Sequence, residues 1–336
     1  VRADASNVRE LIDALSGATV GINALPFKFQ GNFIKAAIEA KVSIADINGF
    51  PVEEVFKYAE EVERAGILII AGIGATPGIT NVLAKYGTED LDEVDQIHIS
   101  FAAWRPAAMS PALLDTCIFE LHPDRRIATD RVYYIDGHYI WCPPFGDPRI
   151  VEFPEPIGRQ EVYCMSHPEV WTIPKFIKAR EVHLRGTWPP KVMQLFKWLG
   201  EYGFLKDEPV EIKGIKISPL EFVREYLVQT KEAQEYYGLN PDIQHYALHV
   251  EVIGKKAGER VRRILTITHP RDGDWAIEPY SKFVGIPLSI AAQMIAKGKI
   301  KGKGILPPEA SIPPKEFLKE LIKRRFILRL EPPLEN

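Results

Sequence analysis

Over the first 95 residues of the chain, strand-like runs of apolar residues alternate with segments whose apolar residues recur at helical spacing. Short runs of branched apolar residues, typical of buried strands, fall at residues 18–25, 42–46 and 67–70. Segments with apolar residues on one helical face separate these runs; they cover residues 8–15, 31–40 and 52–62, with Ser6 as the expected N-cap of the first and Pro51 opening the last. Strict alternation with short connections predicts a parallel sheet with helical crossovers. The pattern is that of the second half of a doubly wound, Rossmann-type nucleotide-binding fold.

The stretch from Ala71 to Asn81 is the centre of this pattern, because it follows the most strand-like run of the chain. Its glycines at 72, 74 and 78 permit backbone conformations closed to other residues and the close approach of a ligand. Pro77 reads as a first helical position. The stretch predicts a strand, turn and helix at the carboxyl end of a parallel strand, where open α/β sheets bind ligands. An ordinary crossover turn is the alternative.

A complete doubly wound domain begins with a strand, a Gly-rich turn and a helix, and the glycines hold the pyrophosphate of a dinucleotide. No such segment precedes Ser6. We therefore expect a segment of roughly 40 residues or more to be missing ahead of Val1, either because the sequence is a fragment or because the gene lost it. The parallel sheet is accordingly expected to be truncated.

Beyond residue 95 the pattern changes to longer, alternating strands broken by a few helices. Asp136-Gly137 is a hairpin turn pattern. The expected strands are 95–102, 132–135, 139–141, 161–164, 181–185, 245–253 and 260–268, and the expected helices are 111–121, 190–202, 218–235, 285–297 and 314–325. Such an order suits a second, α+β domain with a largely antiparallel sheet.

These patterns divide the chain into three parts. Residues 1–95 are expected to form a partial dinucleotide-binding domain, with 281–300 packing back on it. Residues 96–280 are expected to form a domain for substrate binding and dimerisation. Residues 301–336 are expected to form a C-terminal extension with one helix.

Composition and charge narrow the class of protein. Hydrophobic residues make up 46% and charged residues 26% of the 336 positions, as in soluble globular proteins. The net charge of −3 gives no basic field for nucleic acid or a membrane surface. No apolar run approaches the ~20 residues of a membrane helix. Three widely spaced cysteines, at 117, 142 and 164, argue against a disulfide framework or a metal site and favour a reducing, cytoplasmic location.

Several motifs follow one another along the chain: Gly21–Pro26, Gly72–Asn81, Phe153–Gly158, Ser166–Glu169 with Thr172–Pro174, and Val284–Pro287. In this order they resemble the saccharopine dehydrogenase family, in the branch of saccharopine reductases, carboxynorspermidine dehydrogenases and lysine 6-dehydrogenases. The resemblance implies an oxidoreductase that uses NAD or NADP and acts on the C–N bond of an amino acid, either lysine or a lysine-derived, saccharopine-like substrate. The chain departs from the family in lacking the Gly-rich phosphate loop. A non-catalytic family remnant that acts as a scaffold or interaction subunit is the alternative.

The resemblance also assigns cofactor-binding residues to the expected sheet edge. Asn23, Ala24, Leu25 and Pro26 would line the dinucleotide near its ribose and nicotinamide; otherwise they are a strand end with a buried Asn. Gly72 and Pro77 would approach the cofactor from the organising turn. Asp4 would meet the adenine side, or is an exposed terminal carboxylate.

Four residues are candidates for contact with an amino-acid substrate. Asp46 ends a strand and either orients a substrate amine or caps a turn with Asn48. Thr76 stands where some family members carry an acidic residue implicated in substrate binding, which argues against simple transfer of a saccharopine-type site. His167 is a candidate proton carrier, unless it is structural. Arg185 is a candidate for bidentate binding of a carboxylate, or a structural ion-pair partner.

Two further features complete the expectations from sequence. Glu120 and Asp115 read as charges on the solvated face of a helix, and no residue identifies itself as the proton acceptor that amine oxidation needs. A homodimer built by the second domain is expected because aromatic residues occupy both faces of its strands; these are Tyr133, Tyr134, Tyr139, Trp141 and Tyr163. Cover by the first domain or the C-terminal helices is the alternative.

Overall fold

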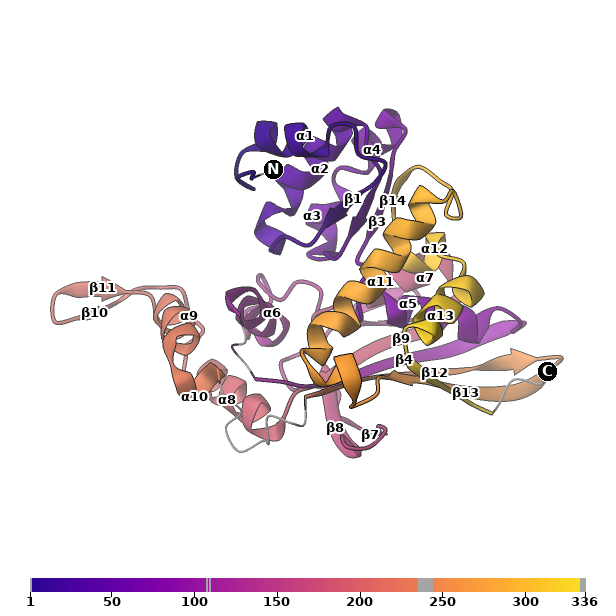
Figure 1. Cartoon of the computed structure of the whole chain (residues 1–336). Helices are drawn as coiled ribbons and strands as arrows, with labels where there is room; N and C mark the ends of the chain where they lie inside the picture. The colour runs from indigo at the N-terminus through magenta and orange to yellow at the C-terminus, as the bar shows by residue number, and fades with distance from the viewer. Residues whose placement is uncertain (1, 107, 109, 235–243, 333–336) are drawn as a thin grey trace.

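The structure is a computed structural model that describes residues 2–106, 108, 110–234 and 244–332 (Figure 1). Its strands are β1 Gly21–Asn23, β2 Ile44–Asp46, β3 Leu68–Ala71, β4 Glu93–Trp104, β5 Val132–Ile135, β6 His138–Trp141, β7 Arg149–Glu152, β8 Arg159–Cys164, β9 Ala179–Thr187, β10 Val210–Ile212, β11 Ile215–Ile217, β12 His245–Lys256, β13 Glu259–Thr268, β14 Gly304–Leu306 and β15 Ile327–Glu331. Its α-helices are α1 Val8–Leu15, α2 Gln30–Ala40, α3 Val52–Phe56, α4 Ala59–Ala65, α5 Ile79–Thr88, α6 Pro111–Leu121, α7 Glu169–Phe176, α8 Pro190–Glu201, α9 Pro219–Gln229, α10 Lys231–Gln234, α11 Pro279–Ala296, α12 Pro308–Ser311 and α13 Pro314–Lys323. Short 3₁₀ turns cover η1 Phe27–Phe29 and η3 Gly273–Ala276.

Two large sheets form the framework. The first holds four parallel strands in the order β1-β2-β3-β14. The second has nine strands, with the path β15-β13-β12-β4-β9-β5-β6 and the hairpin β7-β8 attached to β9. Its pairings are antiparallel except that between β4 and β9. The fold is therefore α/β, with a Rossmann-type parallel sheet and a second, largely antiparallel sheet, as the sequence predicts.

Local sequence patterns explain most element boundaries. Ser110 accepts a hydrogen bond from the Leu113 amide and starts α6 at Pro111, as predicted. Asn7, rather than the predicted Ser6, caps α1, because its side chain accepts hydrogen bonds from the first-turn amides. The single helix expected after Pro51 is two short helices, α3 and α4. Pro77 lies in the turn before α5, which begins at Ile79, so the predicted helix start is wrong by two residues.

Five strands have no counterpart in the expected pattern: β7, the two strands of the isolated hairpin β10-β11, β14 and β15. β14 pairs with β3 and completes the parallel sheet, and β15 pairs with β13 in the large sheet. Residues 301–336 are therefore not an extension with one helix. Their described part contributes two helices, and it adds one strand to each sheet. The two strands were not predicted because three-residue and edge strands are too short to give a clear period. Residue 235, the expected end of α9, lies outside the described residues.

One apolar core joins the two sheets. It includes Ile70 of the parallel sheet, Ile99, Leu184 and Val250 of the large sheet, and the apolar faces of α5, α6 and α11. A second cluster, with Phe33 and Ile34 of α2, covers the other face of the parallel sheet. Figure 1 shows α11 running from the parallel-sheet half to the large sheet, and it packs on β1, β2 and β12. The two halves are thus held against each other by buried apolar surface.

The aromatic residues behind the homodimer prediction have ring partners within the chain. Tyr139 stacks on Trp171 with ring centroids 4.1 Å apart, and Tyr133 stacks on His183 at 5.3 Å. Tyr163 meets Phe145 edge to face. These contacts supply part of the expected cover, and the homodimer stays a prediction.

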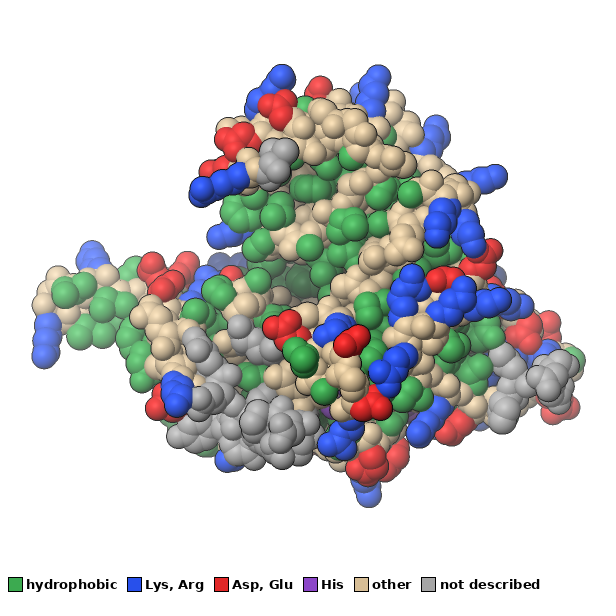
Figure 2. Space-filling model, viewed as in Figure 1, with side chains coloured by type: hydrophobic (Ala, Val, Ile, Leu, Met, Phe, Trp, Pro, Cys, Tyr) green, Lys and Arg blue, Asp and Glu red, His purple; other side chains and the backbone are tan. Residues whose placement is uncertain are grey.

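The surface mixes both signs of charge. In Figure 2, acidic and basic side chains alternate around the parallel-sheet half, and hydrophobic side chains gather toward its lower side and on the hairpin β10-β11, which projects from the body. In the described part of the chain, no helix combines the length and the apolar character needed to cross a membrane.

The turn before α5 supplies a stability prediction. Gly78 has φ +130°, and a Cβ built there would lie 2.1 Å from the Gly74 carbonyl oxygen. Gly78→Ala is therefore expected to lower the free energy of unfolding by about 3 kcal/mol or more. The matched control is Gly285→Ala in α11, where an added Cβ meets nothing within 4 Å; it should raise stability by about 0.5–1 kcal/mol. Urea denaturation measures both, and equal effects of the two variants would contradict the prediction.

Candidate active site

A cleft of about 440 Å³ opens between the two halves of the molecule, at the carboxyl ends of β1, β2 and β3. Its walls come from the segment after β1, the turns after β2 and β3, and the helices α6 and α11, while Tyr246 of β12 and Tyr280 of α11 also line it. This is the edge at which open α/β sheets bind ligands. The volume suits a small ligand or one end of a larger cofactor.

Five of the residues predicted from sequence line this cleft. Ala24, Leu25 and Pro26 follow β1, and Thr76 and Pro77 belong to the turn before α5. The structure therefore brings the expected cofactor segment and the expected substrate residue Thr76 to one cavity.

Three other predicted residues lie beneath the cleft wall and support it. Asp46 is fully buried and accepts hydrogen bonds from the Asn48 amide at 2.8 Å and from Gln30 Nε2 at 3.2 Å. Burial raises the pKa of Asp46 to about 6, although these hydrogen bonds favour the carboxylate. Asn23 is also fully buried and accepts a hydrogen bond from the Leu25 amide. Gly72 is buried against Gly49 and Pro77. Asp46 thus holds the turn with Asn48, which was the alternative interpretation from sequence.

Asp4 lies away from these residues. It is exposed, and its carboxylate accepts hydrogen bonds from the amide and hydroxyl of Ser6, each at 2.8 Å. It does not line the cleft, so the structure does not bring it together with the other candidates.

His167 lies at the centre of a buried chain of charges. Its Nε2 is 3.3 Å from Glu120 Oε1, and its Nδ1 is 3.3 Å from Glu169 Oε2. All three side chains are at most 5% exposed. Burial alone would lower the pKa of His167, but the two carboxylates outweigh it and raise this pKa to about 10. The two carboxyl groups therefore hold the His167 ring between them and favour its protonated form.

Thr76 connects this chain to the cleft. Its hydroxyl donates to Glu169 Oε1 at 2.6 Å, and the hydroxyl of Thr80 donates to the same oxygen at 2.8 Å. Because the Thr76 hydrogen is committed to Glu169, the lone pairs of its oxygen remain for a group in the cleft. The first turn of α5 thus couples the cleft wall to the buried charges.

The interpretation of Glu120 as a solvated charge is wrong. Glu120 is 4% exposed, because α6 turns this side chain toward His167 under the cleft. Asp115, five residues earlier on α6, lines the cleft and forms an ion pair with Arg224 at 2.8 Å. Sequence spacing placed both on a helix but did not indicate which face is covered.

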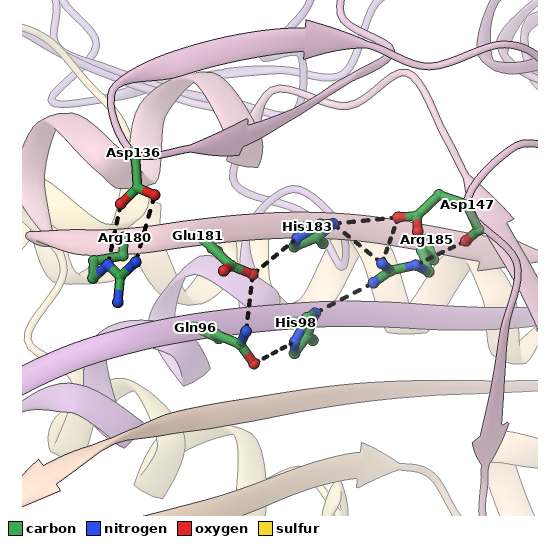
Figure 3. A network of polar contacts seen from close by, with 8 residues as sticks. All are labelled: Gln96, His98, Asp136, Asp147, Arg180, Glu181, His183 and Arg185. Atoms are coloured by element: carbon green, nitrogen blue, oxygen red, sulfur yellow. Dashed lines mark hydrogen bonds and ion pairs between the residues drawn. The ribbon is translucent and has the colours of Figure 1, made fainter.

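Arg185 lies on the other face of the large sheet. It shares that face with His183, whereas Leu184 and Val182 point into the core, and its register partner on β4 is Ser100 rather than Phe101. Figure 3 shows its guanidinium joined to Asp147, His183 and His98. The Nε also donates to the Asp147 carbonyl at 3.0 Å. Arg185 is therefore a structural ion-pair partner outside the cleft, and the expected carboxylate-binding role is not supported.

Arg105, which directly follows β4, is the guanidinium beside the cleft. It is 2% exposed and lies 4.9 Å from the ring of the cleft-lining Tyr280. It donates to the Pro106 carbonyl at 3.0 Å and to Cys117 Sγ at 3.2 Å, while its Nε has no hydrogen-bond partner among the described residues. No carboxylate of the described chain forms an ion pair with it. A buried guanidinium without a carboxylate is suited to bind an anionic ligand group.

Sequence reasoning missed Arg105, Glu169, Tyr246, Tyr280 and Glu309. Glu169 belongs to the motif Ser166–Glu169, so the motif contained it without indicating its role. Tyr246, Tyr280 and Glu309 come from distant segments of the chain, and no local pattern marks them. Glu309 of α12 accepts a hydrogen bond from Asn81 Nδ2 at 2.8 Å, and only the fold brings them together.

The cleft residues fit the nicotinamide end of a dinucleotide. Ala24, Leu25 and Pro26 border the cavity at the sheet edge, together with Gly74 and Pro77. Such a mostly apolar wall suits a flat ring, while Thr76 and Asn48 offer polar atoms at its border.

Comparison with known proteins gives concordant results. The model of the family described as "Saccharopine dehydrogenase C-terminal domain" matches residues 74–327. A carboxynorspermidine synthase of Vibrio alginolyticus is 27% identical over 323 residues, covering 89% of this chain and 74% of that protein. A carboxyaminopropylagmatine dehydrogenase of Synechocystis is 25% identical over 337 residues, covering 95% and 81%. The apo saccharopine dehydrogenase (L-Glu forming) of Saccharomyces cerevisiae has the same fold, with a TM-score of 0.65, 17% identity, and coverage of 98% and 88%.

Glu309 supplies a prediction on pH. Burial raises the pKa of Glu309 from 4.5 to about 7. A carboxyl group whose pKa is raised by folding stabilises the fold at low pH and loses this contribution as the pH rises through the folded value. The difference in unfolding free energy between the wild type and Glu309→Gln should therefore fall by about 3 kcal/mol between pH 4.5 and pH 8.

Chemical denaturation across this pH range measures that difference. Gln keeps the hydrogen bond from Asn81 and does not titrate. The Glu309→Gln variant is therefore the control for the wild type at each pH value. A difference that stays constant with pH would show that Glu309 does not titrate as inferred.

Proposed function

Because this chain belongs to the saccharopine dehydrogenase C-terminal domain family, we propose that it is an NAD(P)-dependent oxidoreductase acting on the C–N bond of an amine that also carries a carboxylate. The observation that carries this proposal is the cleft at the carboxyl edge of the parallel sheet, where Thr76 joins a buried carboxylate network to the expected cofactor segment.

The reaction requires one hydride transfer and one proton transfer. In the oxidative direction, hydride leaves the carbon beside the nitrogen, the nitrogen loses a proton, and the C–N single bond becomes C=N. When bound, the nicotinamide cofactor, NAD or NADP, accepts or delivers the hydride. Ala24, Leu25, Pro26 and Pro77 would hold its nicotinamide end. The chain's other task is to place the substrate carbon and nitrogen in one orientation.

Thr76 is proposed to bind the reacting nitrogen. Its hydroxyl hydrogen is given to Glu169, so its oxygen accepts a hydrogen bond from a substrate N–H. His167 contacts Glu169, and Glu120 contacts the other nitrogen of His167, so these two residues hold Glu169 in place. These three residues are positioning residues, because they act on the substrate through Thr76.

Arg105 is proposed to bind the substrate carboxylate. The guanidinium is buried beside Tyr280 and has an unused Nε. Binding an anion there would pair a charge that has no carboxylate partner in the described chain, which makes the interaction strong. This residue replaces Arg185 in the role that sequence analysis assigned.

The substrate class follows from these two groups. A carboxylate and an amine in one molecule describe lysine and saccharopine-like compounds, which the sequence resemblance favours. They equally describe the carboxylated amines that appear in the names of the Vibrio and Synechocystis relatives. We propose the shared chemistry, and a panel with members of both groups decides between them.

Turnover of that panel by the full chain, followed by NAD(P)H absorbance, tests the function and the role of Thr76 together. Thr76→Val should lower kcat/KM about tenfold through loss of one hydrogen bond to the reacting amine, and Thr76→Ser should retain most of it. The control is Thr88→Val, because the Thr88 hydroxyl donates only to carbonyls of its own helix. Absence of both NAD(P)H binding by calorimetry and turnover would overturn the proposed function, and unchanged activity of Thr76→Val would overturn the role of Thr76.

Arg105→Lys keeps the positive charge but loses the bidentate geometry. It should raise KM for the carboxylate-bearing substrate about tenfold or more, and leave KM for the corresponding decarboxylated amine unchanged. Steady-state kinetics with the two substrates measures this. An equal rise in both KM values would mean that Arg105 only supports the fold of the cleft.

A further inference from the structure

Two cysteines that are distant in the sequence meet in the fold. Cys142 directly follows β6, and Cys164 is the last residue of β8. Both are free thiols, and both are at most 2% exposed. Neither lines the cleft of the candidate active site.

The turn at Gly146 contacts both cysteines. The Cys164 amide donates a hydrogen bond to the Gly146 carbonyl at 3.0 Å. A Cβ built on Gly146 would lie 2.7 Å from Cys142 Sγ, so this sulfur packs against the Gly146 backbone. In addition, Cys164 Sγ lies 3.9 Å from the Val132 carbonyl oxygen, and the Cys142 amide donates to the preceding carbonyl, that of Arg131, at 3.1 Å. The two thiols are therefore neighbours, and that of Cys164 donates a hydrogen bond to the sulfur of Cys142.

This hydrogen bond makes the two sulfurs unequal. It lowers the pKa of Cys142 by favouring its thiolate, and the charges of Arg131 and Arg185 act in the same direction. The pKa of Cys164 is raised, because Cys164 donates that hydrogen bond and is buried beside Cys142. Such a pair has one thiol suited to attack an oxidant and a second thiol that keeps its proton.

Arg131 is the buried cation beside this pair. Its side chain is fully buried, and its Nε donates to the Cys142 carbonyl at 2.9 Å. Its Nη1 donates to the carbonyls of Glu120 and His122, while its Nη2 has no hydrogen-bond partner among the described residues. Burial lowers the pKa of Arg131 to about 10, and the acidic groups that counteract this shift are Cys164 and Cys142. A thiolate on Cys142 would therefore supply a counter-ion for this guanidinium.

We propose that Cys142 and Cys164 form a reversible disulfide when the chain meets a peroxide. The Cys142 thiolate attacks one peroxide oxygen, the O–O bond breaks, and Cys142 becomes a sulfenic acid, while the leaving oxygen takes the proton that Cys142 lost. The Cys164 sulfur then attacks the Cys142 sulfur. The S–O bond breaks, the S–S bond forms, and the hydroxyl group leaves as water with the Cys164 proton. With hydrogen peroxide, two thiols lose two electrons and two protons, and two water molecules form.

Burial selects the class of oxidant. Because both thiols are at most 2% exposed, an oxidant close to water in size reaches them more easily than a bulky disulfide such as oxidised glutathione. Hydrogen peroxide should therefore oxidise the pair much faster than oxidised glutathione does.

Cys117 provides an internal control. It is also a free and fully buried cysteine. It accepts a hydrogen bond from Arg105 at 3.2 Å, but burial outweighs this and raises the pKa of Cys117 to about 11. Cys117 should therefore keep its thiol under conditions that oxidise the pair.

One consequence rests on the proposed function. β8 ends at Cys164, shortly before His167 in the same segment. From the other sulfur, Arg131 connects the Cys142 carbonyl to the carbonyl of Glu120. His167 and Glu120 belong to the buried chain of charges under the cleft. Forming the disulfide removes the thiolate beside Arg131 and shifts both segments, so it should lower turnover.

Mass spectrometry of the full chain tests the disulfide without an assay of activity. Treatment with hydrogen peroxide should remove about 2 Da, the mass of two hydrogen atoms, and proteolytic peptides should join Cys142 to Cys164. Dithiothreitol should restore the original mass. Cys117→Ser should respond like the wild type, and Cys142→Ser should not lose this mass. Cys164→Ser should instead gain about 16 Da at Cys142, the mass of the sulfenic oxygen, which dimedone traps.

The proposal is wrong if peroxide leaves Cys142 and Cys164 of the wild type unlinked, if Cys117 takes part in the disulfide, or if Cys142→Ser still forms one. Turnover of the same samples tests the consequence. The oxidised chain should lose activity that dithiothreitol restores, and unchanged turnover of a fully oxidised chain would refute the coupling to the cleft. A chain without turnover before oxidation would contradict the proposed function but would not alter the masses, so the two proposals fail separately.

Discussion

The turn from Gly72 to Asn81 is the constraint on which both halves of the molecule depend. Its backbone closes on itself, with the Gly74 amide bonded to the Pro77 carbonyl at 2.9 Å and the Ile79 amide bonded to the Gly74 carbonyl at 3.0 Å. This closure starts α5 at a fixed angle below the cleft. The first turn of α5 then presents Thr80 and Asn81 to two carboxylates that arrive from α7 and α12. One tight turn therefore determines where three distant segments meet.

The charges under the cleft are stable only as a group. Glu120, His167 and Glu169 are buried together, with the His167 ring between the two carboxyl groups. Removing one member leaves an uncompensated buried charge, which costs about 3–5 kcal/mol. Such a cost is reasonable where the group orients a side chain for chemistry, as Glu169 orients Thr76. The helix dipole at the start of α5 further favours carboxylates at this place.

Local patterns predicted what local interactions determine. Ser110 and Pro111 define the start of α6, and the hairpin at Asp136-Gly137 has the turn residues that it needs. The family resemblance assigned residues 24–26 to the cofactor, and they line the cleft because strand ends of a parallel sheet share one edge. In contrast, the role of an arginine depends on which face of a distant sheet it occupies. Arg185 points away from the core by strand parity, whereas Arg105 lies just beyond β4 beside the cleft, and neither fact is encoded nearby.

The hairpin β10-β11 shows the same limit from the opposite side. The residues of β10 and β11 alternate apolar and charged positions, a pattern that ordinarily predicts one buried face, yet within the described chain nothing covers that face. Such alternation stabilises a strand only when its apolar side is buried, because an isoleucine or valine that stays exposed contributes no hydrophobic free energy. An apolar period in the sequence therefore does not by itself show that a face is buried. Only the fold distinguishes the exposed face of this hairpin from the faces that pack in the core.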